Sequence, residues 1–223
     1  MWDQDERDGT SFRVSGWRLH VEWAATGVRL VMKHDASREA TGTISLVGGK
    51  LPPIADAFVR GDELHLAMPQ NDGVNAGLDL VLLVVEANRD FLVVESTLAI
   101  QTLWLDAHPM IEVQLPGKGL LATYKQDSAA VYSRPNVPDG PGESGEMRFD
   151  VPTVSVLVDD RDRQSIDESG KAAGTVRFFG EFMEKGVIRK VQPWWVWSST
   201  GPDSARIRSL ASELAKRPLP LTS

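Results

Sequence analysis

Residues 54–115 constrain the fold more than any other part of the chain. They hold its longest apolar runs, and turn residues interrupt those runs at short intervals. Along residues 91–104 the apolar side chains recur at every second position on one face, namely Leu92, Val94, Leu98, Ile100 and Trp104. A period of two, together with many β-branched residues, predicts strands rather than a helix.

The same region predicts how neighbouring strands connect. Residues 57–60 and 63–68 flank the pair Gly61-Asp62, and a glycine in the first position favours a type II′ turn between antiparallel strands. Residues 78–86 are apolar on both faces, which predicts a central strand that is covered twice. The strand over residues 91–104 is long enough for us to expect a β-bulge within it.

The rest of the chain repeats this pattern until its last part. Alternation over residues 12–23 and 28–32 predicts a hairpin, and we expect another between residues 175–183 and 187–197. Ile207, Leu210 and Leu214 instead follow helical spacing and predict a helix over residues 203–215. We therefore expect one domain over residues 1–223, an all-β antiparallel β-sandwich with a C-terminal α-helix.

One long irregular segment interrupts the predicted strands. Residues 133–150 are dense in proline and glycine, and such a segment is a lid, a binding loop or disordered chain. Disorder or a plain surface excursion is the interpretation that its length and composition favour.

Composition excludes several classes of function. The chain has 24 Lys and Arg against 31 Asp and Glu, a net charge of −7, and no basic tract, so we expect neither nucleic acid nor a membrane as partner. It has no cysteine and no closely spaced histidine pair, so no metal site and no cofactor are predicted. Phosphate-binding loops and hydrolase motifs are missing from the sequence as well. An acidic N-terminus without an apolar segment predicts a soluble, cytoplasmic protein.

Two residues are candidates for acid–base chemistry. His108 stands at the end of a predicted strand, where functional residues of β-folds gather. Glu181 lies between Phe179 and Phe182, where partial burial would raise its pKa and suit it to general acid or base catalysis. Pairing of Glu181 with an arginine, Arg177 or Arg189, is the structural alternative.

Five residues are candidates for ligand binding. Glu95 and Gln101 share the polar face of the long strand and, with Arg60 and an aromatic side chain, could line a concave sheet that hydrogen-bonds sugar hydroxyls. Trp194 and Trp195 are adjacent on a strand and so point to opposite faces, which leaves one large aromatic surface for solvent, a ligand or the C-terminal helix.

Several phrases of the sequence resemble known proteins. AFVRGDEL (57–64), IQTLWLDAHP (100–109), EKGVIR (184–189) and PLPLT (218–222) resemble an uncharacterised family of bacterial all-β proteins. The hairpin-rich pattern is also similar to that of galactose mutarotase-like sandwich proteins, whose members bind or rearrange sugars. That resemblance implies a histidine acid and a late glutamate base, at His108 and Glu181.

Two functions are compatible with these observations. The first is a carbohydrate-associated β-sandwich, either a sugar-binding protein or a degenerate sugar-converting enzyme. The alternative is a non-catalytic protein-interaction or scaffold domain that uses the tryptophan surface and the proline- and glycine-rich segment. The sequence leaves open the choice between them, the oligomeric state and whether the protein is an enzyme.

Overall fold

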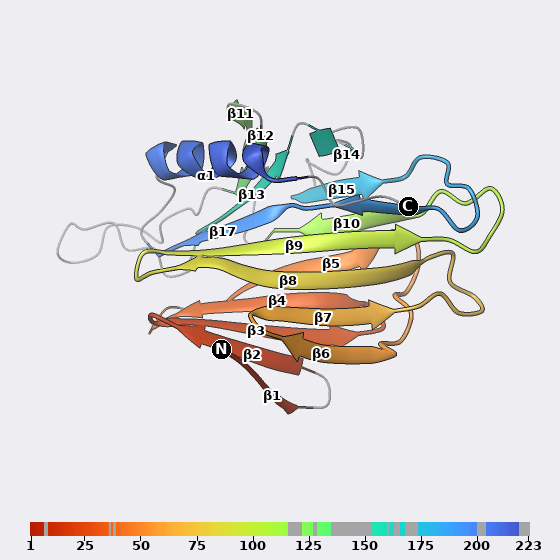
Figure 1. Cartoon of the computed structure of the whole chain (residues 1–223), viewed down its shortest axis with the longest axis horizontal. Coiled ribbons are helices and arrows are strands. Elements are labelled where there is room, and N and C mark those ends of the chain that lie inside the picture. Colours follow the sequence, from red (N-terminus) through yellow and green to blue (C-terminus); the bar gives the residue numbers. More distant parts are fainter. Residues whose placement is uncertain are drawn as a thin grey trace.

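Two antiparallel sheets and one helix make up the described part of the structure, which is a computed structural model (Figure 1). It describes residues 1–6, 9–35, 37, 39–115, 122–126, 129–134, 153–159, 161–162, 166–167, 174–199 and 204–218. The predicted all-β sandwich with a C-terminal helix is confirmed. Of the proline- and glycine-rich segment, residues 135–150 lie outside the described residues, and residues 133–134 end a strand.

The first sheet, sheet A, has eight strands and begins with a meander. Its order is β1 (Trp2–Glu6), β2 (Gly9–Val14), β3 (Trp17–Ala24), β4 (Gly27–His34), β5 (Ala40–Leu46), β10 (Met110–Gln114), β15 (Thr175–Phe179) and β14 (Ile166–Asp167). Its polar–apolar alternation places Trp17, Leu19 and Val21 of β3 in the core. The predicted hairpin between residues 12–23 and 28–32 is present as β3 and β4, but the first predicted strand is wrong in its extent, because a turn at Ser15-Gly16 divides it into β2 and β3.

The second sheet, sheet B, has nine strands. Its order is β11 (Ala122–Gln126), β12 (Ala129–Arg134), β13 (Thr153–Asp159), β17 (Trp194–Ser198), β9 (Phe91–Gln101), β8 (Gly77–Ala87), β7 (Glu63–Met68) and β6 (Asp56–Arg60), with β16 (Ile188–Val191) paired to β9. β6 and β7 meet across Gly61-Asp62, where Gly61 has φ +61° and Asp62 keeps a negative φ. These signs confirm the predicted type II′ turn.

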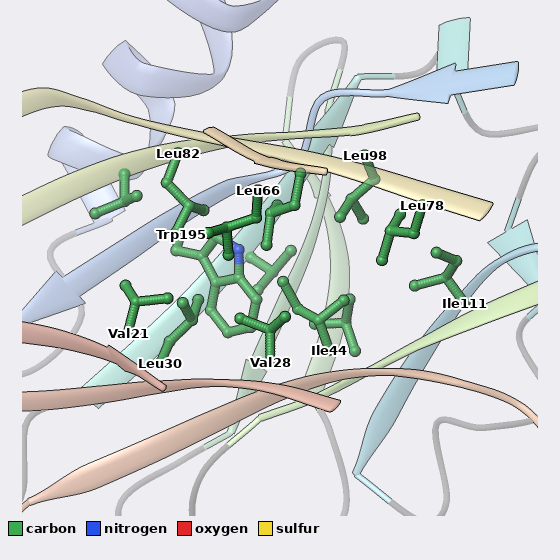
Figure 2. Packing of buried hydrophobic residues seen from close by; sticks show 14 of the residues in the cluster. Val21, Val28, Leu30, Ile44, Leu66, Leu78, Leu82, Leu98, Ile111 and Trp195 are labelled. Atoms are coloured by element: carbon green, nitrogen blue, oxygen red, sulfur yellow. The ribbon is translucent and has the colours of Figure 1, made fainter. Parts of the chain in front are cut away.

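The core lies between the two sheets, with the Trp195 indole at its centre (Figure 2). Leu66, Leu82 and Leu98 reach it from sheet B, and Val21, Val28, Leu30 and Ile44 reach it from sheet A. A Cβ atom on Gly42 would lie 2.7 Å from Cζ3 of Trp195. Glycine is therefore required at position 42, because the indole packs directly against the β5 backbone.

A buried serine joins the two short strands that share one edge of β9. Pro193 cannot donate a backbone hydrogen bond, so the ladder breaks between β16 and β17. The backbone N–H and the hydroxyl of Ser96 both donate to the carbonyl of Pro193, each over 3.0 Å. The same hydroxyl accepts a 3.1 Å hydrogen bond from Trp195 Nε1. Ser96 thus satisfies polar groups that the break would leave unpaired inside the core.

The helix α1 (Ser204–Lys216) covers part of the outer face of sheet B, within one residue of the predicted bounds (Figure 1). Its apolar side chains pack on those of four strands in a second cluster, which contains Val93, Val131, Leu157, Trp194, Val196, Ile207, Leu210, Ala211 and Leu214. The helical spacing read from the sequence therefore corresponds to the face that is buried.

Three other expectations about the strands are wrong. β8 is fully buried on one face only, because α1 reaches just its end, where Val85 packs partly buried against the second cluster, and Val81 is half-buried. The bulge lies in β8, between Val84 and Glu86, and not in the longer predicted strand. Finally, β15 belongs to sheet A whereas β16 and β17 belong to sheet B, so these strands form no hairpin.

Val94 and Val81 provide a test of the two faces of sheet B. Val94 is 1% exposed in the core, so Val94→Asp buries an unpaired carboxylate. We expect it to lower the free energy of unfolding by about 4 kcal/mol or more, out of a typical total of roughly 5–15 kcal/mol. Val81→Asp, on the half-exposed face, should cost about 1 kcal/mol or less. Urea unfolding followed by circular dichroism measures both, and equal losses would contradict this assignment of faces.

Candidate functional site

The connections between strands gather at one end of the sandwich, which we call the loop end (right side of Figure 1). Residues 25–26, 47–55, 69–76, 102–109 and 180–187 all lie there, because the strands that they join end or begin at that side. Loops held by a rigid sheet scaffold are where β-folds place their binding residues. Binding residues are therefore expected at this end.

The loop end contains an apolar pocket of about 500 Å³, which we call the main pocket. Its floor and walls are apolar side chains that are buried or half-buried, with Pro53 exposed at the margin: Trp23, Leu51, Pro52, Pro53, Ile54, Met68 and Val74. Lys50, Asn71 and Asp72 form an exposed polar rim. A volume of this size and a lining of this kind are typical of sites that bind small molecules.

Backbone hydrogen bonds fix the loops that form this pocket. Leu51 N–H donates to the carbonyl of Ala25 over 3.0 Å, which ties the segment before the two prolines to the β3–β4 turn. On the other side, Gln70 Nε2 donates to the carbonyl of Val74 over 2.9 Å. Gly73 has φ +89°, which allows the tight turn in that loop. The pocket is therefore preformed by its own chain.

A smaller pocket of about 170 Å³ lies beside the main pocket and shares Met68 with it. Gln101, one of the predicted ligand-binding residues, lines it together with Asp79 and Leu103. Partial desolvation raises the pKa of the Asp79 carboxyl, and the charge of Lys190 opposes that shift. Gln101 itself donates from Nε2 to the carbonyl of Gly186 over 3.3 Å.

The predicted catalytic pair also lies at the loop end, on two loops that touch. Met183 N–H donates to the carbonyl of Ala107 over 2.9 Å, and the rings of His108 and Phe182 are 5.9 Å apart. Both His108 and Glu181 are exposed. Glu181 Oε2 accepts a 3.0 Å hydrogen bond from Arg189 Nη1, as the structural alternative expected. The fold therefore places His108 and Glu181 on loops that touch, but the Glu181 carboxylate is paired with Arg189.

Glu95 is 6% exposed and lies on the outer face of sheet B, near the end of α1. Its carboxylate accepts a 3.0 Å hydrogen bond from Trp194 Nε1 and a 3.4 Å hydrogen bond from Gln192 Nε2, and it pairs with Arg217. The Arg217 guanidinium also lies 5.0 Å from the centre of the Trp194 ring. Glu95 and Trp194 thus anchor the chain after α1 to the sheet, and their polar atoms are already satisfied.

The two remaining predicted residues lie far from the loop pockets. Trp195 is 0% exposed in the core, so its ring offers no surface to a ligand. Arg60 is exposed at the end of β6, next to the Gly61-Asp62 turn. The strand register places three strand spacings between Arg60 and Glu95, about 14 Å at 4.8 Å each. The seven predicted residues therefore do not form one site.

Four large apolar side chains protrude from the same two loops that carry His108 and Glu181. Leu103, Trp104, Leu105 and Phe182 are 53%, 46%, 79% and 45% exposed, and we call them the apolar loop patch. Sequence reasoning missed this patch because it assigned Leu103 and Trp104 to the end of a strand. The turn residues that follow, Asp106 to Pro109, were the signal that these side chains lie in a loop.

Within the described part of the chain, no group of three or more His, Asp or Glu residues is placed to hold a metal ion. Its one helix is too short and too polar to cross a membrane. Comparison of the chain with protein-family models, with curated proteins and with solved structures gave no match. The resemblances suggested by sequence phrases therefore stay predictions.

The roles of Glu95 and Glu181 can be separated by stability. Glu95→Ala leaves the buried Trp194 Nε1 without its acceptor, at about 1–3 kcal/mol, and leaves Arg217 without its carboxylate, whereas Gln192 keeps its hydrogen bond to Thr97. Glu181→Ala removes an exposed ion pair, which is worth about 1 kcal/mol or less. We expect a loss of about 2–4 kcal/mol for the first variant and a near-neutral change for the second, measured by chemical denaturation. If Glu95→Ala kept the stability of the wild type, the anchoring role would be disproved.

Proposed function

We propose that the protein is a binding protein that takes a small, predominantly apolar molecule in the main pocket. The observation that carries this proposal is the lining: seven apolar side chains line a half-open pocket of about 500 Å³ that has a polar rim. Each Å² of apolar ligand surface buried there contributes about 25 cal/mol. Preformed loops reduce the entropy cost of binding, because little of the chain has to become ordered.

The rim indicates which polar groups such a ligand would carry. Lys50 and Asp72 carry opposite charges, and Asn71 offers an amide donor and acceptor. These groups can hold a hydroxyl, amide or charged end, while the apolar body occupies the floor over Leu51 and Met68. The ligand class is therefore a molecule with an apolar body and one polar end.

A sugar is the second candidate ligand class, and one observation supports it. Trp23 in the pocket wall could stack on a sugar ring, and the rim could bind hydroxyl groups. A sugar, however, presents hydroxyls on all sides, whereas the lining of the pocket is mostly apolar. The ring-stacking surface that Trp194 and Trp195 were expected to provide is buried. An apolar ligand is thus the better fit.

A pair of neighbouring substitutions tests the site. Ala25 lines the pocket mouth and is exposed, so Ala25→Phe should block entry without disturbing the core. Thr26→Phe, at the next exposed position and outside the lining, is the matched control. We expect decanoate and decanol to bind the wild type and the control, and at least about tenfold more weakly to Ala25→Phe. Lys50→Gln should weaken decanoate alone, by about two- to fivefold, since the rim is exposed.

Fluorine NMR of protein labelled with 5-fluorotryptophan provides the measurement. The chain has seven tryptophans, and Trp23→Phe identifies the signal from the pocket wall. A saturable shift of that signal with decanoate or decanol supports the proposal. A shift with mono- or disaccharides alone would favour the sugar hypothesis. Equal weakening by Ala25→Phe and Thr26→Phe would place the binding elsewhere.

The apolar loop patch favours the alternative, a protein-interaction domain, because exposed apolar clusters commonly mark interfaces. A second copy of the chain is the partner that can be tested directly. If the patch drives self-association, sedimentation velocity should show a concentration-dependent dimer that Leu105→Ser with Phe182→Ser abolishes. Phe58→Ser removes a similarly exposed apolar side chain from β6 and is the control. A wild type that stays monomeric would exclude this partner.

A further inference from the structure

Three cations lie side by side on the outer face of sheet A, at the end of the sandwich opposite the loop end. Arg13 of β2 is directly opposite Arg18 of β3, and Arg18 is directly opposite Lys33 of β4. Their neighbours Phe12, Leu19 and Met32 point into the core, so the three charged side chains point outward. The three residues are not consecutive in the sequence. They form a row only because the register of three strands places them side by side.

The row borders a hollow of about 510 Å³, which we call the basic hollow. The turn between β2 and β3 forms part of its wall, with φ values of 49° at Ser15 and 85° at Gly16 that correspond to a type I′ turn. Asp35 N–H donates to the carbonyl of Gly16 over 2.9 Å, which fixes the end of β4 against this turn. The cations therefore stand beside an open hollow whose wall includes this hydrogen-bonded turn.

Within the described part of the chain the three cations have no ion-pair partner, unlike two other arginines on the same face. Arg29 pairs with Glu22 at 2.7 Å and Arg177 with Glu112 at 2.9 Å. Among the described residues no carboxylate lies within ion-pair distance of the row, although Asp35 also lines the hollow. Like charges directly opposite one another on neighbouring strands destabilise a sheet. In a chain with more acids than bases, this unpaired row is an unfavourable arrangement that a bound anion would relieve.

We propose that the basic hollow binds the phosphate group of a small molecule. Three cations and the Asp35 carboxylate give the site a net charge of about +2, which matches a phosphate dianion. The two guanidinium groups can each donate paired hydrogen bonds to phosphate oxygens, and Lys33 adds a point charge. A row of three cations is too short to hold a nucleic acid polyanion, for which affinity rises with each phosphate contacted. The proposal is independent of the main pocket.

The test compares Arg18→Gln with Arg29→Gln. Both variants remove one arginine charge from the outer face of sheet A, but Arg29 is paired and lies outside the hollow. Inorganic phosphate and pyrophosphate are titrated by isothermal calorimetry, with sodium chloride and sodium sulfate as anion controls. Loss of a charge-assisted hydrogen bond should weaken pyrophosphate binding by about tenfold or more in Arg18→Gln. Arg29→Gln should bind like the wild type, and affinity should fall as ionic strength rises.

Thermal unfolding gives a second readout. The difference in melting temperature between the wild type and Arg18→Gln should change sign when pyrophosphate is added. Without ligand, Arg18→Gln should melt at or above the wild-type temperature, because the variant relieves like-charge repulsion. With pyrophosphate, the wild type should gain stability by mass action and Arg18→Gln should not. Vesicles of phosphatidylcholine with phosphatidic acid separate the possible sources of the phosphate: binding to vesicles but not to pyrophosphate would indicate a lipid headgroup. Pyrophosphate binding no tighter than chloride binding, or equal weakening in both variants, would overturn the proposal.

Discussion

Strand β9 is the element on which the other parts of the structure depend, because both of its edges are paired and part of its length is covered on both faces. β8 pairs with almost the whole of one edge, and β17 and β16 share the other. Its inner face supplies the centre of the core, and its outer face carries the residues on which α1 and the following chain are anchored. A single polar atom at its middle, the Ser96 hydroxyl, makes the change between its two partners possible without an unsatisfied group.

Much of this fold could be predicted from local patterns in the sequence. Period-two alternation identified the strands, and helical spacing placed α1 to within a residue. What local patterns could not provide was the partner of a strand that lies far away in the sequence: β15 pairs with β10, more than sixty residues earlier. The chain leaves sheet A after β15 with a positive φ of 68° at Phe179, a conformation that no sequence signal at a phenylalanine predicts. The apolar residues on both faces of β8 were likewise compatible with burial of both faces or of one face alone.

The candidate site was less predictable, for a physical reason. The main pocket combines side chains from the β3–β4 turn and from two loops, and each of these segments taken alone is an ordinary connection. Alternation correctly put Glu95 and Gln101 on one face, but it could not reveal that Trp194 and the chain after α1 would use the carboxylate of Glu95. The row of Arg13, Arg18 and Lys33 required the register of three strands. The sequence identified residues that are able to carry chemistry, but it did not show which residues would lie beside them in the fold.

The position of Trp195 has a consequence for the order in which the molecule can form. The strands from β1 to β5 and from β6 to β9 each follow their partner directly, so they can pair while the chain is still being synthesised. The side chain that fills the space between the two sheets, however, arrives about one hundred residues after its partner Val94. Until then the two sheets have no common centre, and the backbone at Gly42 has nothing to pack against. Completion of the core therefore waits for β17, and the chain that lacks this strand is the form of the protein that most needs protection from aggregation.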